Sequence, residues 1–332
     1  MTTAATDLPP SLDTVRWLVE QACRAPSVLN SQPWRFTYTG EAIELWADTS
    51  RGLTFADPEG RELALSCGAA LFNLRVAIRS LGLTPDVRLL PDPDGPRLLA
   101  QISLLPGQAA DPDEAAALSA LARRHTRRSG FDDKPISPEL GVYLQRAADA
   151  EGALLFHVNE PGMRRRLLQL ARTAEREIAG DPRAQAELER WTPEPGSGQR
   201  DGVPATAYPA RPQLVGDALA ARDLDRGRGI GSADPDGGLP ESISVIVTPT
   251  DVQADWLVAG QAMERVLVRA AQDWAFAAID SQMVELPHIR AELRRALGVS
   301  GFPQIILRLG HAGSAPSTPR RPVDDVLEFA QH

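Results

Sequence analysis

The sequence predicts an α+β protein made of two related halves. Helical patterns alternate with short runs of residues that are typical of strands. One helical pattern begins at Gly68 and recurs at Gly260, and strand-like runs follow both copies. A helix-and-strand unit that occurs twice favours an internal duplication. We therefore expect a first unit over residues 1–106 and a second unit over residues 107–332.

Apolar spacing predicts the elements of the first half. Pro26 ends the first helix, and Thr39-Gly40-Glu41 joins two strands as a hairpin. The longest helical pattern stops at Gly82. In chain order we expect a helix over 11–24, a hairpin of strands over 34–38 and 42–46, a helix over 60–82, strands over 86–90 and 97–104, and a helix over 107–125.

Similar sequence patterns predict the helices and strands of the second half. Ser137 and Pro138 are typical of a helix start, as N-cap and first helical residue. The long helix that contains Gly260 should be capped by Thr250 or Asp251. The expected elements are a helix over 137–150, a strand over 154–158, one or two charged helices over 161–190, a strand over 243–247, the long helix to about 275, and a strand over 304–309.

Residues 191–240, called the insertion below, differ from the rest of the chain. They are rich in Pro and Gly and have little periodicity, as expected of a lid or a disordered segment. Within them, Gly227-Arg-Gly-Ile-Gly231 faintly resembles a dinucleotide-binding loop. That interpretation is discounted, because the stretch neither follows a strand nor opens an apolar helix.

Composition excludes several classes of protein. The net charge of −9 argues against a general nucleic-acid or membrane-surface binder, and no run of 18 apolar residues is present. Cys23 and Cys67 have no metal-binding spacing, so no metal is expected. Both are interpreted as buried thiols, although sequence leaves a disulfide between them open. With no signal-peptide pattern, we expect a cytoplasmic protein. The single lysine, Lys134, suggests a high-GC actinobacterial source.

A basic cluster lies in the middle of the chain. Residues 123–129 contain four arginines, a histidine and two hydroxyl groups, where a predicted helix gives way to a loop. Guanidinium groups bind phosphate oxygens through paired hydrogen bonds, and hydroxyls can add to them. The alternative is a solvated helix end, whose arginines offset the helix dipole.

Two other segments are candidates for a binding site. The loop from Pro26 to Trp34 is dense in small polar groups that can bind a polyol or the edge of a heterocycle, although it could be an ordinary turn. Near the C-terminus, prolines flank the arginines of Thr318-Pro-Arg-Arg-Pro322. That segment is either part of a site or a disordered basic tail.

Together these segments resemble the nitroreductase superfamily. APSVLNSQPWRF is similar to its PSxxNxQPW signature, ARRHTRRSGFD to its RRSxRxFD phosphate motif, and TPRRPVDDVL to its C-terminal ending. The order of the motifs resembles the long actinobacterial Acg branch, in which two nitroreductase-like units are fused. DPEGRELALSCGAAL and DWLVAGQAMERVLVRAA are also similar to that branch. The resemblance covers about residues 15–328, except 195–240.

The resemblance implies an FMN cofactor and assigns residues to it. The phosphate would be held by residues of the basic cluster and the tail, namely Arg124, His125, Thr126, Arg128, Arg320 and Arg321. The loop would lie against the isoalloxazine and ribityl groups through Pro26, Ser27, Val28 and Asn30. The segment after the long helix, Ile279 to Gln282, would present a backbone amide to flavin N5, with Ser281 and Gln282 nearest to that role.

The two units contribute different parts of this site. The first has the PSxxN loop without the arginine-rich motif, and the second has the motif without the loop. One complete site should therefore remain, which implies one FMN per chain. We expect a pseudo-dimeric monomer or a weak homodimer.

The expected function is an FMN-dependent oxidoreductase of nitroreductase type. It would pass a hydride through flavin N5 to or from a small organic substrate, with a nicotinamide as one donor. The cofactor carries the chemistry, so no catalytic residue is assigned. Arg75, Arg128 and a tail arginine are candidates for stabilising the reduced flavin. The alternatives are a protein that sequesters FMN beneath the insertion, where Arg222 lies, and a biosynthetic dehydrogenase specific for one molecule.

Overall fold

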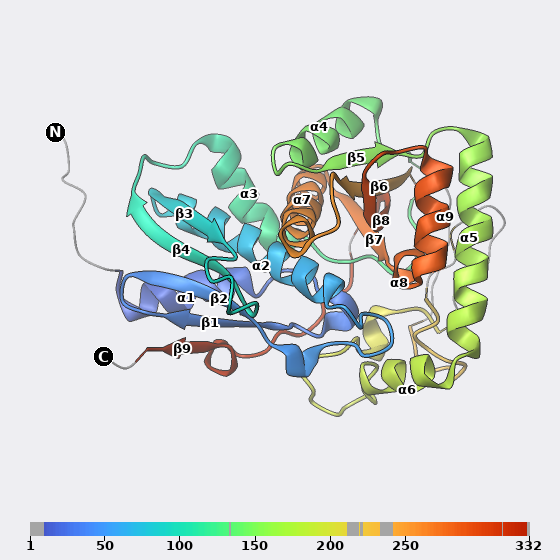
Figure 1. Ribbon diagram of the computed structural model, residues 1–332, viewed down its shortest axis with the longest axis horizontal. Helices are drawn as coiled ribbons and strands as arrows, with labels where there is room; N and C mark the ends of the chain where they lie inside the picture. The colour runs from blue at the N-terminus through green and yellow to red at the C-terminus, as the bar shows by residue number, and fades with distance from the viewer. Residues whose placement is uncertain are drawn as a thin grey trace.

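The computed structural model describes residues 10–132, 134–210, 219, 222–232, 242–313 and 315–330. It is an α+β structure with two separate, mainly antiparallel sheets and two long helices between them (Figure 1). The α+β class that the sequence predicts is therefore confirmed.

The first sheet has five strands in the order β3-β4-β2-β1-β9. Their inward-facing residues, among them Trp34, Phe36 and Ile43, pack against the first helices in the main core. The elements of this half are α1 (Leu12–Ala22), β1 (Trp34–Tyr38), β2 (Ala42–Ala47), α2 (Arg61–Ser80), β3 (Leu83–Leu89), β4 (Leu98–Pro106) and α3 (Pro112–Arg123).

The second sheet has four strands in the order β5-β6-β8-β7. In Figure 1, α5 and α9 cover one face of this sheet. The other face packs on the main core, while Leu167, Val245 and Leu293 belong to a second cluster beneath α5 and α9. Its elements are α4 (Pro138–Asp149), β5 (Leu154–His157), α5 (Pro161–Gly180), α6 (Pro182–Arg190), β6 (Ser242–Thr248), α7 (Gln253–Gln272), β7 (Ala275–Asp280), α8 (Gln282–Glu285), α9 (Pro287–Leu297) and β8 (Phe302–His311).

The two sheets share one topology once β9 is set aside. Counted in chain order within each sheet, the first strand pairs with the second, the second with the fourth, and the fourth with the third. All of these pairs are antiparallel. A 20-residue helix connects the second strand to the third in both halves. Each second strand also shifts register against the fourth, at Leu45/Trp46 in β2 and at Ile246/Val247 in β6.

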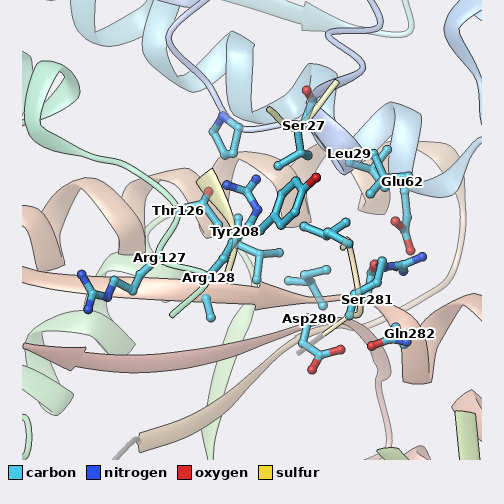
Figure 2. Close-up of a pocket in the computed structure, with 18 of the residues that line it drawn as sticks. Ser27, Leu29, Glu62, Thr126, Arg127, Arg128, Tyr208, Asp280, Ser281 and Gln282 are labelled. Atoms are coloured by element: carbon cyan, nitrogen blue, oxygen red, sulfur yellow. Dashed lines mark hydrogen bonds between the residues drawn. The ribbon is translucent and has the colours of Figure 1, made fainter. Parts of the chain in front are cut away.

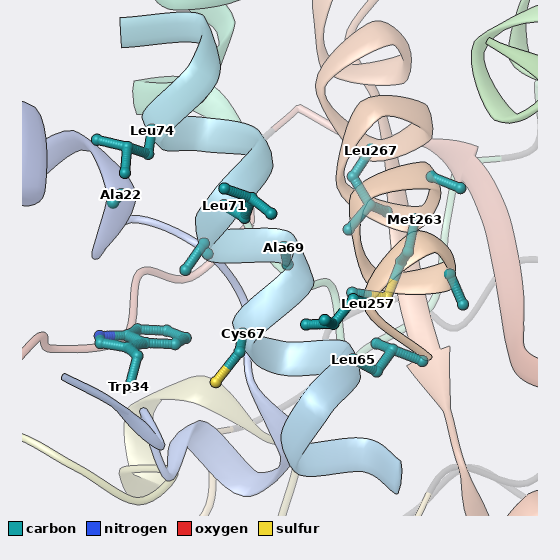
Figure 3. Packing of buried hydrophobic residues seen from close by; sticks show 14 of the residues in the cluster. Ala22, Trp34, Leu65, Cys67, Ala69, Leu71, Leu74, Leu257, Met263 and Leu267 are labelled. Carbon is teal, nitrogen blue, oxygen red and sulfur yellow. The ribbon is translucent and has the colours of Figure 1, made fainter. Parts of the chain in front are cut away.

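The helices α2 and α7 pack closely at two glycines (Figure 3). A Cβ atom on Gly260 would lie 2.8 Å from the carbonyl carbon of Leu65 and closer still to its oxygen. A Cβ atom on Gly68 would clash in the same way with the backbone of Leu257. Gly68 and Gly260 are separated by the same number of residues as Leu65 and Leu257. The contact between the helices is therefore reciprocal, as it is across a twofold axis.

Several elements differ from the sequence-based expectation. The strand β7 and the helix α9 lie in a region where no element was predicted, because their apolar runs are short or interrupted by charges. The helix α7 begins at Gln253 with Val252 as its N-cap, which contradicts the expected cap at Thr250 or Asp251. Asp251 instead pairs with Arg290 and accepts a hydrogen bond from Trp256.

The C-terminal segment returns to the first sheet. β9 (Leu327–Phe329) pairs parallel with β1, although the expected boundary assigns these residues to the second unit. The hydrogen bond from Phe36 N to Val326 O continues this pairing. The tail therefore crosses from one half of the molecule to the other and carries Thr318–Arg321 past the end of α1.

Two further features agree with a folded core. Cys23 and Cys67 are both free and buried. Burial raises the pKa of the Cys23 thiol to about 12, so it stays protonated at neutral pH.

By length and composition α2 could span a membrane, but most of its residues are buried inside the protein.

Candidate functional site

A cavity, partly open to solvent, lies where the two halves and the insertion meet. Small-molecule sites are usually concave. Figure 2 shows its wall, with Ser27 and Leu29 on one side, Thr126 and Arg128 on another, and Ser281 beyond them. The wall thus combines the loop after α1, the basic segment after α3 and the segment after β7.

The loop after α1 has an unusual backbone. Leu29, Asn30 and Gln32 all have positive φ angles, of 46°, 55° and 52°. Such conformations cost free energy in residues other than glycine and persist only where the surroundings enforce them. Here Val28 N donates to Ser66 Oγ on α2 at 3.2 Å, which holds the loop against the cavity.

The side chains of Asn30 and Gln32 make most of the hydrogen bonds that hold the loop in this conformation. Asn30 Nδ2 donates to Gly202 O in the insertion at 2.8 Å and to Pro319 O in the tail at 3.1 Å. Gln32 Nε2 donates to Arg200 O, and Gln32 Oε1 accepts from Arg321 N, both at 2.8 Å. These two amides therefore join the loop to the insertion and to the tail.

The basic segment carries a guanidinium at the cavity wall, that of Arg128. Among the described residues, its Nη1 is buried without a hydrogen bond. Burial, and then the charge of Arg124, lower the pKa of Arg128 to about 10. A buried cation of this kind is unfavourable unless an anion accompanies it. Arg127 is also among the residues that line the cavity, but in Figure 2 its side chain points away from it, and its Nε donates to Gly130 O at 2.7 Å.

Arg124 lies behind Arg128 and has other partners. Its Nε is 3.2 Å from Glu264 Oε1 on α7, and its Nη2 donates to Arg24 O at 2.8 Å. Its Nη1 is buried without a hydrogen bond in the described part of the chain. Burial, and then the charges of Arg124, Arg320 and Arg24, lower the pKa of His125 to about 4. His125 is therefore neutral at physiological pH.

Arg320 adds charge from the tail. Its guanidinium donates to the carbonyl oxygens of Cys23, Arg24 and Ala25 at the end of α1, at 2.8 to 3.0 Å. Burial, and then the Arg124 charge, lower the pKa of Arg320 to about 9. Carbonyls at a helix C-terminus favour a cation. Two of these arginines, Arg124 and Arg320, come from distant segments and both act on the buried carboxylate of Glu264.

The cavity wall also contains carboxylates. Glu62 and Asp280 line the cavity, and burial raises the pKa of both, to about 6 for Asp280. Asp280 can therefore hold or release a proton near neutral pH. From the insertion, Arg222 forms an ion pair with buried Glu285 and donates to Ser281 Oγ at 3.3 Å.

The insertion forms one wall of the cavity. Its buried residues Val203, Tyr208 and Leu224 make a small apolar cluster that includes Leu29 of the strained loop. Tyr208 Oη accepts from Arg228 Nη2 at 2.9 Å, which fixes the ring. The Tyr208 ring lies among the labelled cavity residues in Figure 2.

The Gly-rich stretch of the insertion has a structural role. The carboxylate of Asp225 accepts hydrogen bonds from the backbone N–H groups of Gly229, Ile230 and Gly231. Although burial opposes it, this bonding lowers the pKa of Asp225. The carboxylate of Asp225 thus occupies the position that an external anion would take in a backbone nest. This agrees with the sequence-based interpretation that the stretch is not a dinucleotide-binding loop.

Comparison with known proteins gives the family. A Mycobacterium tuberculosis protein named "Putative NAD(P)H nitroreductase Rv3131" is 31% identical over 331 residues, which cover 97% of this chain and 93% of that protein. The chain belongs to the nitroreductase family. Within the family it is related to Acg: the M. tuberculosis "Putative NAD(P)H nitroreductase acg" is 29% identical over 95% of each chain. The resemblance stated from the sequence motifs is confirmed.

Two other comparisons were made with this nitroreductase-family chain. No family model matches it. A solved nitroreductase with bound FMN from Desulfitobacterium hafniense DCB-2 is 13% identical, with a TM-score of 0.40, and the match covers 65% of this chain and 98% of that one.

The structure brings most of the expected site residues of this nitroreductase-family chain to one cavity. Those that line it are Pro26, Ser27, Val28, Thr126, Arg128, Ser281 and Gln282. Those that lie outside its wall are Asn30, Arg124, His125, Arg320 and Arg321. In place of direct contact, Asn30 and Arg321 hold the loop, while Arg124 and Arg320 contribute charge behind Arg128. That any of them binds a cofactor stays a prediction.

Sequence reasoning missed three residues of this site. Glu62 and Glu264 each lie within an apolar helical pattern, where a lone acid is easily taken for a surface residue, yet both are buried. A charged residue at an apolar position was the available signal. Tyr208 lies in the insertion, where the sequence has no periodicity to indicate burial.

Proposed function

We propose that this protein is an FMN-dependent oxidoreductase of nitroreductase type, which uses NAD(P)H to reduce a small organic substrate. The observation that carries the proposal is Arg128 in the cavity wall, whose Nη1 is buried without a hydrogen bond from the described residues, with Arg124 and Arg320 behind it. This excess of positive charge fits a phosphate dianion. The nicotinamide donor is suggested by the names of the relatives.

The residues present fit FMN. Arg128 and Thr126 would hold the phosphate, with Arg124 and Arg320 supplying further positive charge. The loop at Ser27 and Val28, together with the segment after β7, would line the ring system. When bound, FMN supplies hydride transfer at N5. The protein contributes orientation through the strained loop, and the apolar residues of the insertion exclude water from one side.

We also propose that the chain is a fusion of two nitroreductase-like units, with a boundary near residue 106, that acts as a pseudo-dimer. The shared strand order and the reciprocal contacts of Gly68 and Gly260 support it. In the second half a four-residue turn, 150–153, replaces the eleven-residue loop 23–33 between the first helix and first strand. Accordingly, we expect one FMN per chain.

Anaerobic stopped-flow spectroscopy tests the oxidoreductase. The purified, FMN-loaded protein should lose its flavin absorbance when mixed with NADPH or NADH, and a nitroaromatic acceptor should restore it. Bleaching by neither nucleotide within minutes, with FMN still tightly bound, would contradict the proposal. Failure of the protein to take up FMN at all would show that the cofactor assignment is wrong.

A second candidate is an FMN-sequestering protein that the insertion keeps closed. The buried ion pair between Arg222 of the insertion and Glu285 favours it, because it fastens the insertion across the cavity. Breaking one partner of such a pair leaves a buried charge and costs about 3–5 kcal/mol.

Arg222→Gln should therefore loosen the insertion and accelerate FMN dissociation, measured by fluorescence on dilution, at least about tenfold. Arg226→Gln, at a more distant surface ion pair of the insertion with Glu189, is the control and should leave the rate unchanged. If NADPH reduces the flavin of the Arg222→Gln variant but not that of the wild type, the sequestering function is favoured. If wild-type protein is reduced equally fast, the insertion does not block the site.

A further inference from the structure

A buried carboxylate lies behind the arginines of the cavity. Glu264, on α7, is fully buried, and its Oε1 is 3.2 Å from Arg124 Nε. Neither carboxyl oxygen has a hydrogen bond from the described residues, so its contact with Arg124 is an ion pair only. Asn73 on α2, also fully buried, is its neutral neighbour.

The groups that act on this carboxylate are Arg124 in the segment after α3, Arg320 in the tail and the uncharged amide of Asn73 on α2. Around them, His125 lies close to the charges of Arg24, Arg124 and Arg320, and Arg128 lies close to that of Arg124. His125 is neutral above its pKa of about 4. Glu264 is therefore the described group of the cluster whose charge changes most between pH 7 and 8.5, since Arg320, with its pKa lowered to about 9, begins to lose its proton only at the upper end of this range.

We propose that Glu264 is the exchangeable counter-charge of the phosphate site: it balances Arg124 while the site is empty and takes up one proton from solvent when a phosphate dianion enters beside Arg128. The inference rests on the proposed function, since the phosphate is that of FMN. In this role Glu264 is a positioning residue, because it acts on the ligand through Arg124 and does not line the cavity.

The electrostatics give the sign of the effect. Burial raises the pKa of Glu264 to about 7, against the lowering effects of Arg124, the Asn73 amide and Arg320. A nearby dianion disfavours a second negative charge and raises this pKa further. Above pH 7 the empty protein holds Glu264 ionised, whereas the complex holds it protonated. Binding then takes up a proton, so affinity falls as pH rises.

The experiment measures FMN and riboflavin binding by flavin fluorescence between pH 7.0 and 8.5, where the FMN phosphate is already dianionic. The FMN Kd of the wild type should rise roughly 5- to 10-fold over this range, as expected for uptake of up to one proton. Calorimetry at pH 8 in buffers of different ionisation enthalpy should count that proton. Riboflavin, which lacks the phosphate, should show neither effect.

Two variants assign the proton. Glu264→Gln should bind FMN with a Kd that changes less than about twofold over the same range and with no proton uptake. Glu151→Gln is the matched control, because Glu151 is also buried and paired with two arginines, Arg75 and Arg265, away from the cavity. It should keep the wild-type slope.

The outcomes are separable. If Glu264→Gln keeps the wild-type slope, the proton belongs to another group and the inference is wrong. Wild-type protein that binds FMN tightly with no pH dependence and no proton uptake also overturns the inference, while the proposed function stands. If the protein binds FMN at no pH, the proposed function fails and this inference fails with it.

Discussion

Replacing Arg128 by glutamine should weaken FMN binding by about 10- to 100-fold, because a hydrogen bond to a charged group is worth about 1.5–3 kcal/mol. The same change should not destabilise the empty protein. Nη1 of Arg128 is buried without a hydrogen bond from the described residues, and burial lowers the pKa of this guanidinium to about 10. A lowered pKa in a base means that its charged form costs stability at every pH below that value. Removing the charge should therefore not lower the free energy of unfolding of the empty protein.

The control is the neighbouring arginine. Arg127→Gln changes the same residue type one position away, but the Arg127 side chain points away from the cavity and its Nε bonds to Gly130 O. Equilibrium titration with FMN and thermal unfolding of the flavin-free proteins should be run in parallel. The assignment fails if Arg128→Gln binds FMN like the wild type, or if Arg127→Gln loses it instead. Arg124→Ala combined with Arg128→Ala should abolish flavin retention.

The largest effect on stability should come from Gly260→Ala. The added methyl group would overlap the backbone carbonyl of Leu65, which no side-chain rotation can relieve. The helices α2 and α7 would have to move apart across the main core. Overpacking in a core typically costs 1–3 kcal/mol, and a backbone clash should reach the upper end, about 3 kcal/mol. For a chain of 332 residues, that lowers the Tm by roughly 4 °C.

Two further glycine variants test the interpretation. Gly180→Ala adds the same methyl group at the end of α5, where nothing lies within 4 Å, and should be neutral or stabilising by up to about 1 kcal/mol. Gly68→Ala makes the reciprocal clash with Leu257 and should cost about as much as Gly260→Ala. Denaturant unfolding measures all three. Equal stability of Gly260→Ala and Gly180→Ala would rule out the close approach of α2 and α7.

Most of the secondary structure was predictable because long elements bury one regular face. The helix expected over 60–82 and the hairpin over 34–46 are both present, since their apolar spacing dominates any window of sequence. The strand β7 was missed because Ala275–Asp280 contains three alanines and no β-branched residue before Ile279. β9 is three residues long and forms only because the tail reaches the edge of β1.

The sequence alone determined which residue types gather in the site: the polar loop after α1, the basic segment after α3 and the two tail arginines. It could not assign their partners. Arg124, Arg127, Arg128 and Arg320 are alike in sequence, yet only the fold places Arg320 on the carbonyls of α1, Arg124 against Glu264 and Arg128 at the cavity. The reason is that a guanidinium's role depends on which acceptors lie within about 3 Å. Those acceptors come from segments that tertiary packing alone brings together.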